Sequence, residues 1–111
     1  MDLHHANWDG LPWKRVREGV ERKAFSGSGG TMAMNRLMPG HEPRPHSHSH
    51  EQMVYIVSGE IDFHGAPPRA VTSKPPGPRH CTAPLTHWGE VVGNKPVLNL
   101  DVFTPRRAEY T

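Results

Sequence analysis

The sequence lacks the features that mark several common classes of protein. It has a single cysteine, Cys81, in 111 residues, so an internal disulfide is excluded and the cytoplasm is the expected location. No apolar run approaches the roughly 18 residues of a membrane span, and no signal-like apolar segment follows Met1. The basic residues are scattered and the formal net charge is only +2, so nucleic acid is not an expected partner.

Long helical patterns are also missing, and this points to a β protein. Short apolar stretches are separated by turn residues, among 11 glycines and 12 prolines, which is typical of a single-domain all-β sandwich or barrel. Hydrophobic residues make up only 34% of the chain, so burial must be concentrated in a few strands. Because a sheet edge then needs a cover, we predict a homodimer.

The chain divides into an arm, a barrel and a tail. Residues 1–23 are expected to form an N-terminal arm with one or two short strands, residues 31–103 the barrel, and residues 104–111 a short polar tail. Within the barrel, residues 65–84 contain six prolines and no acidic residue. Such a segment is a poor strand former, and an irregular loop is expected there in place of two strands.

A row of histidines precedes the apolar stretch Met53–Val57. In an extended strand His46, His48, His50 and Gln52 project to one face, because side chains alternate. Imidazole nitrogens and an amide oxygen are ligands for a divalent transition metal such as Ni, Zn, Fe or Mn. The sequence therefore predicts a metal site on this face, whereas a solvated histidine-rich loop is the alternative.

The spacing of this row resembles a known motif. Gly40, His46-x-His48, Gln52 and Gly59 match the first motif of the cupin superfamily, with Gln in the place that most members fill with Glu. The row and the ending Asp101-Val102-Phe103-Thr104-Pro105-x-Arg107 resemble cupins of the KdgF type. The resemblance implies a double-stranded β-helix, or jelly-roll barrel, that binds one divalent metal.

The fourth metal ligand has two candidates. His87 has the family-like spacing from His48 and from Asp101, whereas His80 lies in a Pro-x-Gly-x-x-His fragment that also resembles the second cupin motif. We favour His87, so that the predicted ligands are His46, His48, Gln52 and His87. With four ligands in place, His50 is expected beside the site.

The resemblance also implies an activity and the residues that perform it. Cupins of the KdgF type open the ring of 4,5-unsaturated uronate monosaccharides from pectin and alginate, which gives linear keto-uronates. The resemblance assigns proton transfer to Asp101, carboxylate recognition to Arg107 and substrate packing to Phe103, and Tyr55 is a further candidate for the pocket wall. The anionic sugar is then the expected ligand. Alternatives are another cupin lyase or isomerase, for example a dimethylsulfoniopropionate lyase, and a non-catalytic cupin that binds sugar or metal.

Overall fold

The computed structural model describes residues 7–42, 44, 50–65, 69–73, 77–81 and 87–110, of which residues 65, 69–73, 77–81 and 87 are described by their backbone alone. No helix in these ranges is long and apolar enough to cross a membrane. The elements, in chain order, are η1 (Trp8–Gly10), β1 (Lys14–Arg17), β2 (Val20–Ser26), β3 (Thr31–Leu37), β4 (Glu51–Ser58), β5 (Ile61–Gly65), β6 (Arg69–Ser73), β7 (Gly77–Cys81), β8 (His87–Val91), β9 (Val97–Thr104) and η2 (Ala108–Tyr110).

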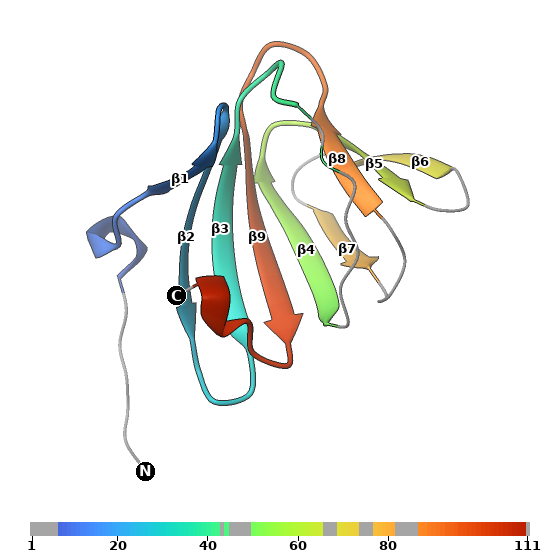
Figure 1. The fold of residues 1–111 in the computed structure, drawn as a ribbon. Helices are drawn as coiled ribbons and strands as arrows, with labels where there is room; N and C mark the ends of the chain where they lie inside the picture. The colour runs from blue at the N-terminus through green and yellow to red at the C-terminus, as the bar shows by residue number, and fades with distance from the viewer. Residues whose placement is uncertain are drawn as a thin grey trace.

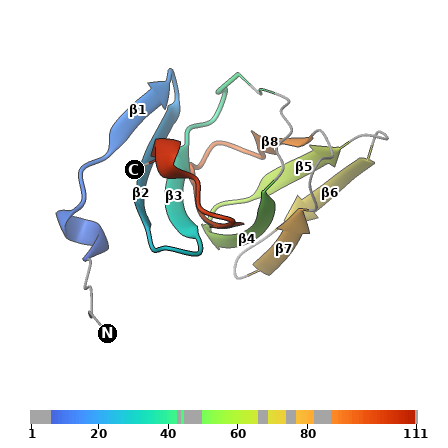
Figure 2. The same ribbon diagram turned by 60° about the horizontal axis from the view of Figure 1, so that its bottom comes forward.

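The strands form two antiparallel sheets, which confirms the all-β prediction. One sheet has the order β1-β2-β3-β9-β4-β7, and the other has the order β6-β5-β8. The large sheet curves, so that β1, β2 and β3 lie on one side of the molecule and β5, β6 and β8 on the other (Figures 1 and 2). The 3-10 helix η2 packs against β2 and β3. Between the two sheets lies the interior that holds the candidate site.

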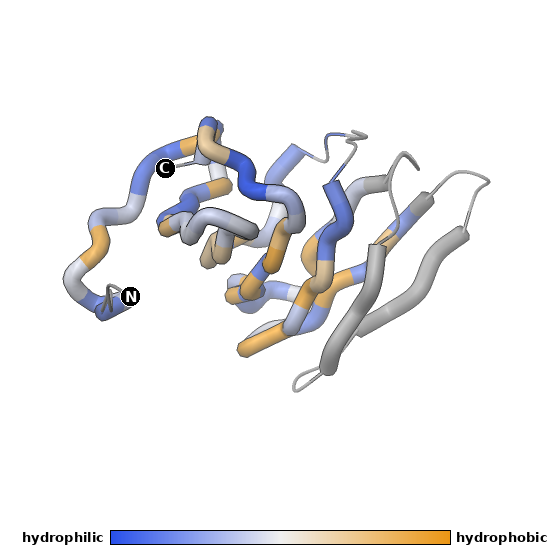
Figure 3. The backbone as a smooth tube through the Cα atoms, turned by 90° about the horizontal axis from the view of Figure 1, so that it is seen from below, coloured by the Kyte–Doolittle hydropathy of each residue, from blue (hydrophilic) through white to orange (hydrophobic). Residues whose placement is uncertain are grey.

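Strand alternation decides which side chains face this interior. The buried residues on three adjacent strands of the large sheet recur at every second position, and they are Thr31, Ala33 and Asn35 on β3, Val97, Asn99, Asp101 and Phe103 on β9, and Gln52, Val54 and Ile56 on β4. Hydrophobic and hydrophilic residues accordingly follow one another at short intervals along the described strands (Figure 3). A compact apolar cluster forms from Val54, Ile56, Ile61 and Val97.

The opposite face of β4 remains open to solvent. Met53, Tyr55 and Val57 are each more than 40% exposed, so Met53–Val57 is a half-buried strand. The homodimer predicted from the low apolar content stays a prediction.

The N-terminal region contributes a full strand to the large sheet. β2 pairs with β3 over seven residue pairs, so Val20–Ser26 belongs to the sheet although the sequence assigned its first half to an arm. The two N-terminal tryptophans pack beside this strand. The ring of Trp8 lies 5.5 Å from that of Phe25, and the Lys23 ammonium lies 4.5 Å from the ring of Trp13.

The proline-rich segment differs from its expected irregular loop. It contains two short strands, β6 and β7, which pair with β5 and β4 respectively. Both are outermost strands of their sheets. Proline is tolerated at such edges because one side of an edge strand has no ladder partner for the missing backbone N–H. A proline-rich segment can therefore form a strand at the edge of a sheet, although it could not form a central strand.

The turn between β4 and β5 generates a testable prediction. Gly59 has φ +83°, and a Cβ there would collide with the carbonyl oxygen of Pro96 and lie 2.9 Å from the Cα of Val97. Gly59→Ala should therefore lower the free energy of unfolding by about 2 kcal/mol or more, measured by urea denaturation.

Two other glycines separate the causes of this effect. Gly93 has φ +80° with nothing within 4 Å of its added Cβ, and Gly27 has neither the positive φ nor a neighbour. Gly93→Ala should cost about 1 kcal/mol and Gly27→Ala less than about 0.5 kcal/mol. Equal stability of the Gly59 and Gly27 variants would contradict the close approach of this turn to β9.

Candidate functional site

A cavity of about 390 Å³ opens between the two sheets. It runs from the β1–β2 hairpin to η2, and its walls come from the inward faces of the strands. Four residues that the sequence analysis selected line it together, namely Gln52, Asp101, Phe103 and Arg107. They come from β4, from β9 and from the segment that follows β9.

Asp101 is the buried acid of this cavity. Its side chain is only 7% exposed, and amide groups surround it. Asn35 Nδ2 donates to one carboxylate oxygen at 2.7 Å and Asn99 Nδ2 donates to the other at 2.8 Å. The side-chain amide of Gln52 provides a further hydrogen bond.

These contacts act on the pKa of Asp101 in opposite directions. Burial disfavours the charged form and is the largest effect, whereas the hydrogen bonds from Gln52, Asn99 and Asn35 and the charge of Arg22 favour it. Burial prevails and raises the pKa of Asp101 to about 6. Near neutral pH this carboxyl group can therefore accept and return a proton.

Arg107 is held at the η2 end of the cavity. Its backbone N–H donates to Thr31 Oγ1 at 2.9 Å, and its Nε donates to Glu109 Oε1 at 2.9 Å. The guanidinium carbon lies 4.2 Å from the centre of the Tyr110 ring and 4.8 Å from that of Phe103. Its Nη1 is buried and has no hydrogen-bond partner among the described residues. This nitrogen can therefore donate to an acidic ligand.

Arg22 is a second cation at the same end, and sequence reasoning missed it. It lies on β2, and its Nε donates to Asn35 Oδ1 at 2.9 Å. Its guanidinium carbon is 3.8 Å from the centre of the Tyr110 ring. Because Asn35 in turn donates to Asp101, Arg22 and the buried acid are linked through one amide. The available signal was that Arg22 lies two positions after Val20, which is buried, so that strand alternation places both side chains on one face of β2.

Tyr55 is not brought to the cavity. It lies three positions from Gln52 on β4, so alternation places the two side chains on opposite faces of the strand, and Tyr55 is 43% exposed. Its assignment to the pocket wall is corrected accordingly. Trp88 does line the cavity, and its ring stacks on His64 at 5.2 Å. His50 lies beside Phe103, with 6.4 Å between the ring centres.

Two of the four predicted metal ligands, His46 and His48, lie outside the described residues. Within the described part of the chain no three His, Cys, Asp or Glu side chains form a group that could hold a metal ion. Gln52 lines the cavity, and its side chain hydrogen-bonds to Asp101. The oxygen of such an amide is an atom type that binds divalent metals, so Gln52 fits the chemistry of the predicted site.

The two candidates for the fourth ligand have different register positions. His87 pairs with Gly65, two positions along the strands from the pair of Phe63 and Gly89, which both line the cavity. His80 pairs with Met53, which lies on the exposed face of β4. By strand alternation His87 shares the strand face of Gly89, whereas His80 lies at the register position of an exposed residue; the choice between them stays a prediction.

Comparison with known proteins identifies the fold. No family model and no curated protein sequence matches this chain. Solved structures do match: KdgF from a Halomonas species superposes with a TM-score of 0.84 at 21% identity, over 95% of this chain and 97% of that one. An RmlC-like cupin from Shewanella frigidimarina gives a TM-score of 0.86 at 17% identity, over 99% and 97%.

A third structure belongs to an enzyme. A sugar phosphate isomerase of the cupin superfamily from Silicibacter pomeroyi gives a TM-score of 0.75 at 15% identity, over 91% of this chain and 75% of that one. At identities this low, the structural likeness shows the fold alone. The chain therefore has the cupin fold, a double-stranded β-helix, and in this fold it resembles KdgF.

Proposed function

We propose that this chain is a metal-dependent enzyme that opens the ring of 4,5-unsaturated uronate monosaccharides to give linear keto-uronates. The observation that carries the proposal is the convergence of Gln52, Asp101, Phe103 and Arg107 on one cavity. These residues are distant in sequence and suit the separate requirements of the reaction. The likeness in fold to KdgF and to a sugar phosphate isomerase supports an enzymatic role.

The charge of the cavity supports an anionic substrate. Four arginines line it, and Asp101 is the one acid among its described lining residues. A uronate carries a carboxylate, which a guanidinium group binds through two parallel hydrogen bonds. Arg107, with its buried Nη1, would hold this carboxylate, and Arg22, which contacts the same Tyr110 ring, would add positive charge.

His46, His48, Gln52 and His87 would hold the divalent metal. When bound, such a cation supplies Lewis-acid polarisation of a substrate oxygen. Because the four ligands are all neutral, the positive charge of the site is retained, which favours an anionic substrate. The register position of His87 supports its place in the set.

Asp101 would move the proton that the reaction requires. The substrate is a cyclic enol ether with a hemiacetal at C1. Removal of the C1 hydroxyl proton by the carboxylate forms the C1 aldehyde as the bond from C1 to the ring oxygen breaks, and that electron pair leaves an enolate at C5. Return of the proton to C4 completes the isomerisation without any other reactant. A pKa of about 6 allows one carboxyl group to act first as base and then as acid.

Metal content tests the ligand set. Alanine variants of His46, His48, Gln52 and His87 should each lose most of the divalent metal that the wild-type protein retains after dialysis, measured by elemental analysis, because each removes one of four ligands. His80→Ala is the matched control and should keep its metal. Metal retained by His87→Ala together with metal lost from His80→Ala would reverse the choice between these two histidines.

Turnover of an unsaturated uronate, followed by loss of absorbance of its conjugated double bond, tests the function itself. In this assay Arg107→Ala should mainly raise KM, by about ten- to a hundredfold, as expected for loss of a charge-assisted hydrogen bond to the carboxylate. The neighbouring Arg106→Ala is the control, since Arg106 is exposed and does not line the cavity. Absence of turnover by metal-loaded wild-type protein would refute the proposed activity.

Asp101→Asn should instead lower kcat. Loss of a general acid or base costs on the order of a hundredfold or more, and metal content should stay unchanged. Asp62→Asn is the matched control, because Asp62 lies on β5 and is not part of the cavity lining. If Asp101→Asn keeps wild-type turnover while a chelator abolishes it, Asp101 does not transfer the proton.

A further inference from the structure

We propose that the end of the cavity away from Arg107 holds a second anion-binding subsite, formed by Arg17 and His41, that takes a carboxylate or phosphate group. The sequence analysis assigned no function to either residue. Both line the cavity, and neither belongs to the ligand set or to the catalytic residues proposed above.

Backbone contacts bring the two residues together. Arg17 ends β1, and His41 follows β3. The N–H of Met38 donates to the carbonyl of Gly19 at 2.8 Å, and the N–H of His41 donates to the carbonyl of Met38 at 3.2 Å. The turn after β3 is thereby fastened to the turn between β1 and β2.

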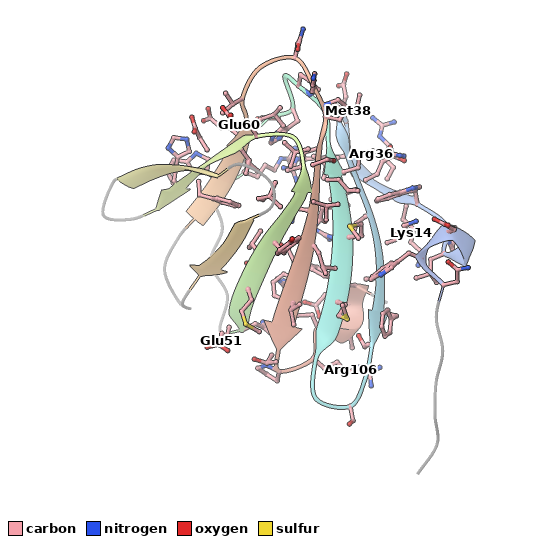
Figure 4. The ribbon with its side chains drawn as sticks, turned by 180° about the vertical axis from the view of Figure 1, so that it is seen from behind. Lys14, Arg36, Met38, Glu51, Glu60 and Arg106 are labelled. Carbon is pink, nitrogen blue, oxygen red and sulfur yellow. The ribbon has the colours of Figure 1, made fainter. Side chains whose placement is uncertain are left out.

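This subsite lies at the opposite end of the sheet from Arg107. The backbone N–H of Arg107 donates a hydrogen bond to the side chain of Thr31, at the start of β3. Arg17 and His41 lie near Leu37, at the other end of β3. Six residues of extended chain span about 20 Å. Figure 4 shows the same separation in the labelled residues, with Met38 at one end of the sheet and Arg106 at the other.

Three buried polar atoms at this end lack a well-formed hydrogen bond. Arg17 Nε and both ring nitrogens of His41 are buried, and no hydrogen bond of normal geometry reaches them among the described residues, although the His41 ring interacts with the backbone of Glu42. Arg17 makes one contact there, from Nη2 to the carbonyl oxygen of Glu42 at 3.3 Å. A buried donor without an acceptor is costly. An oxyanion between the two side chains would accept from Arg17 and from the N–H of His41.

The electrostatics at this end also favour an anion. Burial is the first cause that lowers the pKa of Arg17, and the nearby charges of Arg44 and Arg22 lower it further, against the opposing charge of Glu42. Burial likewise lowers the pKa of His41 and the charge of Arg17 lowers it further, against a hydrogen bond with the backbone of Glu42 and the charge of Glu90, which both raise it. The neighbouring walls are the apolar side chains of Val16, Val20 and Leu37. A bound anion would relieve the mutual repulsion of these cations in surroundings that screen charge weakly.

Calorimetric titration of the full-length, metal-loaded protein with inorganic phosphate, and separately with acetate, tests the subsite. Arg17→Gln should weaken the binding by about tenfold or more, and His41→Phe, which keeps a ring but removes both nitrogens, should weaken it as well. Arg15→Gln on the same strand is the control, since Arg15 is exposed, and it should leave the affinity unchanged. If phosphate binds and acetate does not, the subsite takes phosphate groups. If both anions bind, the subsite also takes carboxylates. Either result supports the proposed subsite.

Three results would overturn the subsite. In the first, neither anion binds saturably to the wild-type protein. In the second, Arg107→Gln reduces the affinity and Arg17→Gln does not. In the third, a chelator abolishes the binding while Arg17→Gln leaves it intact. The last would place the anion on the metal. Because the titration uses no uronate, its failure is distinguishable from failure of the proposed activity.

Discussion

A carboxylate withdrawn from water imposes the constraint on which the interior of this protein depends. Asp101 is buried on β9, and a buried charge is tolerated only where hydrogen bonds replace water. The side chains of Asn35, Asn99 and Gln52 provide them. Three adjacent strands therefore carry polar residues at inward positions, although such positions usually hold apolar side chains.

This requirement divides the interior into two parts. Val54, Ile56, Ile61 and Val97 form the apolar cluster that stabilises the packing of the two sheets. The polar part around Asp101 contributes little to apolar burial and forms the walls of the cavity instead. A low hydrophobic content is thus compatible with a folded barrel, because the burial is concentrated in one cluster.

The C-terminal segment belongs to the site as much as the strands do. The Tyr110 ring contacts the guanidinium groups of both Arg22 and Arg107, and it meets the ring of Phe103 edge-on at 5.4 Å. Contacts of this kind with an aromatic face stabilise cations. Two like charges are thereby held at one end of the cavity, where each faces the interior rather than solvent. What the sequence presented as a short polar tail closes this end of the site.

The fold class and the face on which each strand residue lies follow from local periodicity in the sequence. The spacing of glycines and prolines predicted an all-β chain. Alternation along β9 places Asp101 and Phe103 on one face, because the period of an extended strand depends only on neighbouring residues. The same rule places Tyr55 opposite to Gln52. The resemblance carried by residues 40–59 and 101–107 indicated the cupin fold that the structural comparison supports.

Only the tertiary structure decided which distant residues meet. Asn35 reaches Asp101 across 66 positions of sequence, and no local pattern encodes the register between β3 and β9 that joins them. Arg22, Tyr110 and the pair of Arg17 and His41 likewise become site residues through strand pairing and through the fastening of two turns. The proline-rich strands β6 and β7 depend on their edge positions, which arise only when the sheets assemble. Contacts between remote segments are set by the packing of the whole chain, whereas the period of one strand is set by its own backbone.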